Sequence, residues 1–252
     1  MVRGIDSFRD WFHGYENCYV IIGGTACDLL MEEEGLDFRA TKDVDMVLII
    51  EAVDGEFVSR FWDYVRAAGY DRRNKSTGDP QFYRFSKPMN AGYPAMIGLF
   101  SRVPDVISLP GSAVLTPLPI DEEISSLSAI LLNADYYEFM KQGMVRAFGV
   151  TVLNALCLIP FKAKAWMELS ERKAGGEHVD SRHIRKHRND VFRLTELLEH
   201  SQGHLPNVPE PVRLDMRDFV RRMAAEDVNL KQLGIVGRPK EEILDQISEI
   251  YG

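Results

Sequence analysis

Two aspartates, Asp43 and Asp45, stand at the head of the apolar run "DVDMVLII" at residues 43–50. Such a run is typical of a buried strand, and successive side chains on a strand point to opposite faces of the sheet. Both carboxylates would therefore lie on one face, with their Cα atoms ~7 Å apart. Like charges held at this spacing repel each other and raise each other's pKa, so the pattern calls for a compensating positive charge.

A divalent cation supplies that charge most directly. Mg²⁺ prefers oxygen ligands and is commonly held by one or two carboxylates together with the phosphates of a substrate, and Mn²⁺ accepts the same ligand type. A structural role stays open as the alternative, in which Asp43 caps a turn and Asp45 pairs with Arg39 or Lys42.

A glycine pair lies upstream of the two aspartates. Gly23, Gly24 and Thr25 follow the apolar run at residues 18–22 and precede a segment with helical character at residues 26–34. A strand, a glycine turn and a helix in this order present backbone N–H groups at a helix N-terminus, where phosphate binds well. Two glycines alone mark only a tight turn, but the combination with the paired aspartates is far more specific.

The periodicity of apolar residues predicts two halves of different character. The first half is expected to contain helices at 5–16, 26–34 and 55–69 and strands at 18–22, 43–50, 81–86 and 94–101. The second is expected to contain helices at 121–133, 135–142, 154–173, 180–201, 211–225 and 239–251. A proline-rich passage at 110–120 separates them, so we predict an α+β domain at 1–118 and a helical domain at 119–252.

Composition narrows the functional class. The chain has 252 residues and a net charge of -8, which disfavours bulk electrostatic binding to nucleic acid. Its three cysteines are an odd number without metal-binding spacing, which argues against a disulfide framework. The N-terminus does not read as a signal peptide, and the longest apolar run is too short for a membrane span. We therefore expect a cytoplasmic protein with no membrane partner.

The stretch "VIIGGTACDLL…RATKDVDMVLII" resembles the opening of the nucleotidyltransferase superfamily, the DNA-polymerase-beta-like fold. The shared pattern is a strand, a Gly-Gly or Gly-Ser turn, a helix, and two acidic residues one apart on the next strand. The "GGTA" turn with Arg39 and Thr41 is most similar to the AbiEii-like branch, known for toxins of toxin–antitoxin systems. The segments "LIPFKAKAWMEL" and "RKHRNDVFRLTELL" resemble family helices more loosely.

This resemblance implies a nucleotidyltransferase-like N-terminal domain with a mixed sheet, a helical C-terminal domain and an NTP bound in a cleft between them. A nucleotide monophosphate would pass to an acceptor that is RNA, protein or a small molecule. Asp43 and Asp45 would hold Mg²⁺ or Mn²⁺, and Lys186 and Asp190, four apart on one helix, would join them as catalytic residues. The residues implied to bind the triphosphate are Gly23, Gly24, Thr25, Arg39, Thr41 and Lys162.

The chain departs from the family pattern at one position. The family carries a third carboxylate on a neighbouring strand, and the expected strand here reads Ile97-Gly98-Leu99. Three readings stay open: an enzyme whose site is completed by a residue such as Asp190, a weakened relative that binds nucleotide as a sensor or as the partner of an antitoxin-type protein, and a soluble protein in which the aspartates have no ligand.

Overall fold

The computed structural model describes residues 2–70, 82–102, 130, 133–199 and 202–252. The chain divides into two compact units. Unit 1 comprises Met1–Ile120 and Met144–Leu153, and unit 2 comprises Asp121–Gly143 and Asn154–Gly252. The boundary predicted between residues 118 and 119 lies outside the described residues.

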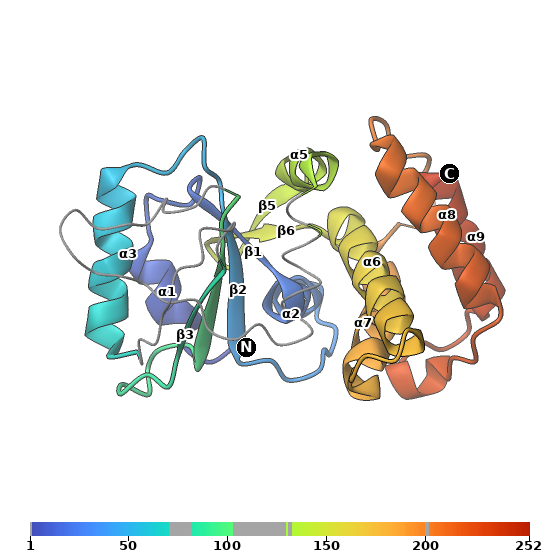
Figure 1. The fold of residues 1–252 in the computed structure, drawn as a ribbon, viewed down its shortest axis with the longest axis horizontal. Coiled ribbons are helices and arrows are strands. Elements are labelled where there is room, and N and C mark those ends of the chain that lie inside the picture. The colour runs from blue at the N-terminus through green and yellow to red at the C-terminus, as the bar shows by residue number, and fades with distance from the viewer. Residues whose placement is uncertain (1, 71–81, 103–129, 131–132, 200–201) are drawn as a thin grey trace. The chain divides into compact units, whose positions relative to one another are not determined.

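Among the described residues, unit 1 is built on a six-stranded sheet with the order β3-β4-β2-β1-β6-β5 (Figure 1). Neighbours β1–β2, β3–β4 and β5–β6 pair antiparallel, whereas β2–β4 and β1–β6 pair parallel. This confirms the predicted α+β class with a mixed sheet. The strands are Tyr19–Ile22 (β1), Asp43–Leu48 (β2), Phe82–Ser86 (β3), Met96–Phe100 (β4), Met144–Ala147 (β5) and Val150–Leu153 (β6).

Helices cover both faces of this sheet. Helices α1 (Ile5–Trp11) and α3 (Gly55–Ala68) lie on one face, and α2 (Gly23–Glu33) lies on the other (Figure 1). On the first face, aromatic rings of α1 and α3 pack against aromatic rings of the sheet. The ring centroids of Phe8 and Tyr19 lie 5.3 Å apart, and those of Phe61 and Phe85 lie 5.4 Å apart. Such contacts between large apolar rings bury much surface and hold the helices on the sheet.

The hairpin of β5 and β6 was not predicted from the sequence, which placed residues 144–153 in the helical half. Ala147 pairs with Val150 across a two-residue turn in which Phe148 has φ +48° and Gly149 has φ +78°. Two positive φ values match the twist of a tight hairpin, but the usual residue before the glycine is Asn or Asp. Because phenylalanine occupies that position instead, the turn was not recognised in the sequence. Strand β6 pairs with β1 in the sheet.

Unit 2 is helical in its described residues, and α6 packs on both α7 and α8. The predicted helix at 121–133 lies almost wholly outside the described residues, and the one predicted at 180–201 ends at Leu194 before a short 3₁₀ turn. Within the described ranges, no helix is long and apolar enough to cross a bilayer. The helices are Ala134–Gln142 (α5), Ala155–Ala174 (α6), Ser181–Leu194 (α7), Thr195–Leu197 (η1), Glu210–Ala224 (α8), Leu230–Leu233 (η2) and Lys240–Tyr251 (α9).

Helix α6 continues through Pro160 without interruption. Pro160 has no N–H, so the carbonyl of Leu156 one turn earlier loses its usual helical donor. The hydroxyl of Tyr251 in α9 donates to that carbonyl at 2.6 Å. Burial raises the pKa of Tyr251 well above its ordinary value, which keeps the hydroxyl protonated as a donor. The last helix thus satisfies the carbonyl that the proline leaves open.

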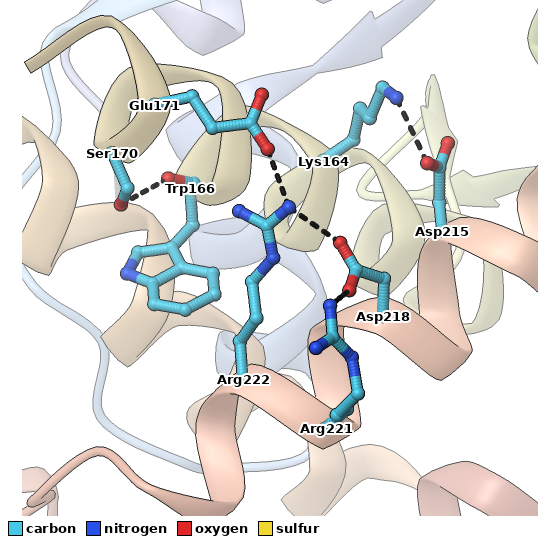
Figure 2. A network of polar contacts seen from close by, with 8 residues as sticks. All are labelled: Lys164, Trp166, Ser170, Glu171, Asp215, Asp218, Arg221 and Arg222. Atoms are coloured by element: carbon cyan, nitrogen blue, oxygen red, sulfur yellow. Dashed lines mark hydrogen bonds and ion pairs between the residues drawn. The ribbon is translucent and has the colours of Figure 1, made fainter. Parts of the chain in front are cut away.

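Polar contacts also fasten α8 to α6 (Figure 2). Arg222 in α8 binds Asp218 within its own helix at 2.7 Å and Glu171 in α6. Asp215 receives two hydrogen bonds, from Lys164 at 2.9 Å and from the hydroxyl of Tyr136 at 2.8 Å. These contacts join α8 to α6 and to α5 within unit 2.

Candidate functional site

Strand β2 places both aspartates on the α2 side of the sheet. Val44 and Met46, which alternate with them, are fully buried on the opposite side. Asp43 and Asp45 are instead half-buried, so their carboxylates are within reach of a ligand. Alternation along β2 therefore places both carboxylates on one face of the sheet, as the sequence predicts.

The glycine turn lies directly against Asp45. Ile22, the last residue of β1, pairs with Asp45 across the antiparallel ladder, so Gly23 begins α2 beside that carboxylate. Gly23 has φ +71°, and a Cβ there would lie 2.8 Å from Asp45 Oδ2. Both the left-handed backbone and the close approach require glycine at this position.

Gly24 is held just as closely by the loop before β2. A Cβ at Gly24 would lie 3.0 Å from Thr41 Oγ1 and 3.1 Å from Arg39 Nη2. The Arg39 guanidinium also lies 5.0 Å from the ring centroid of Phe38, a distance suited to a cation–π contact. The structure thus brings together Gly24, Arg39 and Thr41 from separate parts of the sequence.

Thr25 has a structural task that the sequence did not reveal. Its side chain is fully buried, and its hydroxyl donates to the backbone carbonyl of Asp43 at 2.6 Å. This bond fixes the first turn of α2 against the head of β2. The backbone N–H groups of this turn remain the part suited to an anion, because Ile22 at the N-cap position has an apolar side chain that cannot cap them.

Gly98 lies beside Asp45 in the sheet. The parallel register of β2 and β4 pairs the two residues, so a side chain at position 98 would point to the same face as the Asp45 carboxylate. From the resemblance, we predicted that Gly98 stands where the family carries a third carboxylate. Among the described residues, no group of three or more His, Cys, Asp or Glu side chains is arranged to hold a metal ion.

The predicted residues from the second half lie in unit 2. Lys162 in α6 and Asp190 in α7 are almost completely buried, and Lys162 Nζ lies 3.0 Å from Asp190 Oδ2. Arg193 lies 3.8 Å from the other carboxylate oxygen. Lys186, four residues before Asp190 on α7, is half-buried. The structure therefore brings Lys162 and Asp190 together as an ion pair, a contact that the sequence did not predict.

The residues around the glycine turn fit a divalent cation with a phosphate-bearing ligand. Two carboxylates on one strand face offer oxygen ligands, and Gly24 leaves room where a Cβ would fill the space beside Arg39 and Thr41. The N-terminus of α2 carries the positive end of the helix dipole. The Arg39 guanidinium and the Asp45 carboxylate thus both lie against the glycine turn at the start of α2.

No family model matches the chain, and no curated protein matches it significantly. Solved structures that are similar to it include the following two. The crystal structure of an antigenic nucleotidyltransferase-like protein from Paracoccidioides brasiliensis is 14% identical, with 85% of this chain and 83% of that chain covered and a TM-score of 0.40. The solution structure of the antibiotic-resistance factor ANT(2'')-Ia is 12% identical, with 88% of this chain and 92% of that chain covered and a TM-score of 0.39.

Proposed function

We propose that unit 1 binds an NTP together with Mg²⁺ or Mn²⁺, and that the protein transfers the nucleotide monophosphate to an acceptor hydroxyl. The observation that carries this proposal is the position of Gly24. A Cβ at Gly24 would lie 3.0 Å from Thr41 Oγ1 and 3.1 Å from Arg39 Nη2, so any side chain there would crowd these two residues, next to a turn that contacts Asp45. A glycine held this way lets phosphate approach the backbone N–H groups of a helix N-terminus.

Each group has a defined task in this proposal. Asp43 and Asp45 hold the cation, which supplies charge neutralisation on the phosphate oxygens when bound. The first N–H groups of α2 and the Arg39 guanidinium bind the triphosphate and orient it. The Thr25 hydroxyl keeps that helix start fixed on β2. The acceptor is RNA, protein or a small molecule.

A second candidate function is nucleotide binding without efficient transfer. The pairing of Gly98 with Asp45 favours it, because position 98 supplies no side chain to assist the two carboxylates. In that case the protein would act as a nucleotide sensor or as the toxin-type partner of an antitoxin protein, as in the AbiEii-like branch. The two candidates share the binding site and differ only in turnover.

The test is a thermal-shift screen of the four NTPs with Mg²⁺ or Mn²⁺. A ligand that binds only the folded state stabilises it by about 2.7 kcal/mol at a concentration 100-fold above its Kd. For a chain of this size, we expect a rise in Tm of several degrees that requires both metal and nucleotide. Transfer joins the nucleotide monophosphate to the acceptor and releases pyrophosphate, so pyrophosphate release after RNA, protein or small-molecule acceptors are added to these samples separates the enzyme from the binding protein. No shift with any nucleotide and metal would overturn both candidates.

Replacing Gly24 with alanine is expected to weaken NTP binding at least about tenfold, because the new methyl group displaces Arg39 and Thr41 and blocks the approach of phosphate. The measurement is the Kd for NTP with Mg²⁺ by calorimetry. Gly55→Ala is the matched control, since it adds the same methyl at the start of α3, where no atom lies within 4 Å. Equal NTP affinity in the parent and Gly24→Ala would remove this turn from the site.

A further inference from the structure

Arg84 completes a row of residues that crosses the sheet to Asp45. Gly98 in β4 pairs with Asp45 on one side and with Arg84 in β3 on the other. Residues paired in this way point to the same face of a sheet. The Cα atoms of Arg84 and Asp45 are therefore separated by two strand spacings, roughly 9.5 Å.

The neighbours of Arg84 in β3 support this orientation. Phe85 is 1% exposed, and its ring lies among Phe61 and Trp62 of α3 on the other face. Side chains alternate along a strand, so Arg84 points to the face that carries Asp43 and Asp45. Arg84 is half-buried, and its Nε atom is shielded from solvent.

Arg84 was not among the site residues predicted from the sequence, although its alternation with Phe85 was a usable signal. An arginine keeps its charge at any pH at which the protein is folded. No side chain at position 98 stands between Arg84 and Asp45, so nothing from that strand position screens the two charges from each other. A permanent cation thus lies on the same face as the two carboxylates, two strands from Asp45.

We propose that Arg84 is a positioning and charge-compensating residue of this site, one that weakens binding of a metal ion alone and strengthens binding of a metal–triphosphate complex. This inference rests on the proposed function. A fixed positive charge repels a lone divalent cation at Asp43 and Asp45. A triphosphate remains anionic after one divalent cation has bound it, so the same charge attracts the complex. The site would thereby favour metal that arrives with its nucleotide.

The test measures two affinities in the full-length protein, for Mn²⁺ alone and for inorganic tripolyphosphate with Mg²⁺. Arg84→Gln is expected to tighten Mn²⁺ binding severalfold and to weaken tripolyphosphate binding about tenfold. Arg84→Lys keeps the charge and should stay near the parent in both measurements. Arg66→Gln is the matched control, because it removes the same charge from α3 on the opposite face, where Arg66 pairs with Asp63.

Opposite changes in the two affinities are the result that a merely structural role cannot produce. If Arg84→Gln moves both affinities the same way, or neither, the inference is wrong while the proposed function stands. If the parent binds neither probe and no NTP with Mg²⁺, the proposed function fails and the inference fails with it. If the parent binds NTP with Mg²⁺ but neither probe, the inference alone is wrong. Should Arg84→Gln not fold, Arg84→Met replaces it, because methionine removes the same charge and keeps an unbranched apolar side chain on the strand. That variant should also tighten Mn²⁺ binding and weaken tripolyphosphate binding, and unchanged affinities would overturn the inference.

Discussion

Replacing Lys162 with methionine is expected to lower the free energy of unfolding by about 3–5 kcal/mol. The Lys162 ammonium lies 3.0 Å from Asp190, whose side chain is completely shielded from water. Removal of the lysine leaves that carboxylate buried without its main counter-charge. Arg193 at 3.8 Å compensates in part, which places the expected loss toward the lower end of this range. Urea unfolding followed by circular dichroism measures the change.

A double variant tests whether the lost stability comes from the charge left without its partner. Lys162→Met with Asp190→Leu replaces both charges of the ion pair by apolar groups and should recover part of the loss, since neither buried charge is left without the other. Recovery is expected to be incomplete, because Arg193, whose side chain is 18% exposed, then loses its contact with Asp190. Lys164→Met is the matched control. Lys164 pairs with Asp215 at 2.9 Å but is 29% exposed, so its loss should be only about 1 kcal/mol.

NTP affinities of the same variants test the functional roles predicted for Lys162 and Asp190. An ion pair that only stabilises unit 2 predicts that the folded double variant binds NTP with the affinity of the parent. A clear loss of NTP affinity in a stably folded double variant would instead place one of the two residues in the binding site. A single Lys162→Met variant as stable as the parent would contradict the structural role.

Replacing Asp43 and Asp45 together with asparagine is expected to abolish the metal-dependent part of NTP binding. Asparagine keeps the size of each side chain but is a far weaker ligand for Mg²⁺, which prefers anionic oxygen. The stabilisation of about 2.7 kcal/mol that saturating NTP and Mg²⁺ give the parent should therefore disappear. The fold should persist, because both side chains are half-buried and the apolar residues between and after them form the core side of β2. Melting curves with and without ligand give both quantities.

Asp6→Asn with Asp10→Asn is the matched control for charge. These exposed aspartates bind Arg9 on α1, on the opposite face of the sheet, and the change in net charge is the same. The control should keep the full response to NTP and Mg²⁺. A parent that responds to neither metal nor nucleotide, combined with a double variant that unfolds, would show that Asp43 and Asp45 serve the fold alone.

The sequence predicted those features of the candidate site that depend on local backbone geometry alone. Strand alternation places Asp43 and Asp45 on one face wherever the strand lies, and a glycine pair between a strand and a helix presents N–H groups in any context. The same local rules predicted the helices of unit 1 and the α+β class, because amphipathic periods are properties of short segments.

The contacts between segments depended on strand register and on helix packing, which local patterns do not encode. Antiparallel pairing of Ile22 with Asp45 decides that Gly23 contacts that carboxylate, and the parallel pairing of β2 with β4 decides that Gly98 lies beside it. The burial of Lys162 with Asp190 likewise required α6 and α7 to pack together. The β5–β6 hairpin joined the sheet because β6 pairs with β1, and pairing between strands more than a hundred residues apart is decided by the energy of the whole fold.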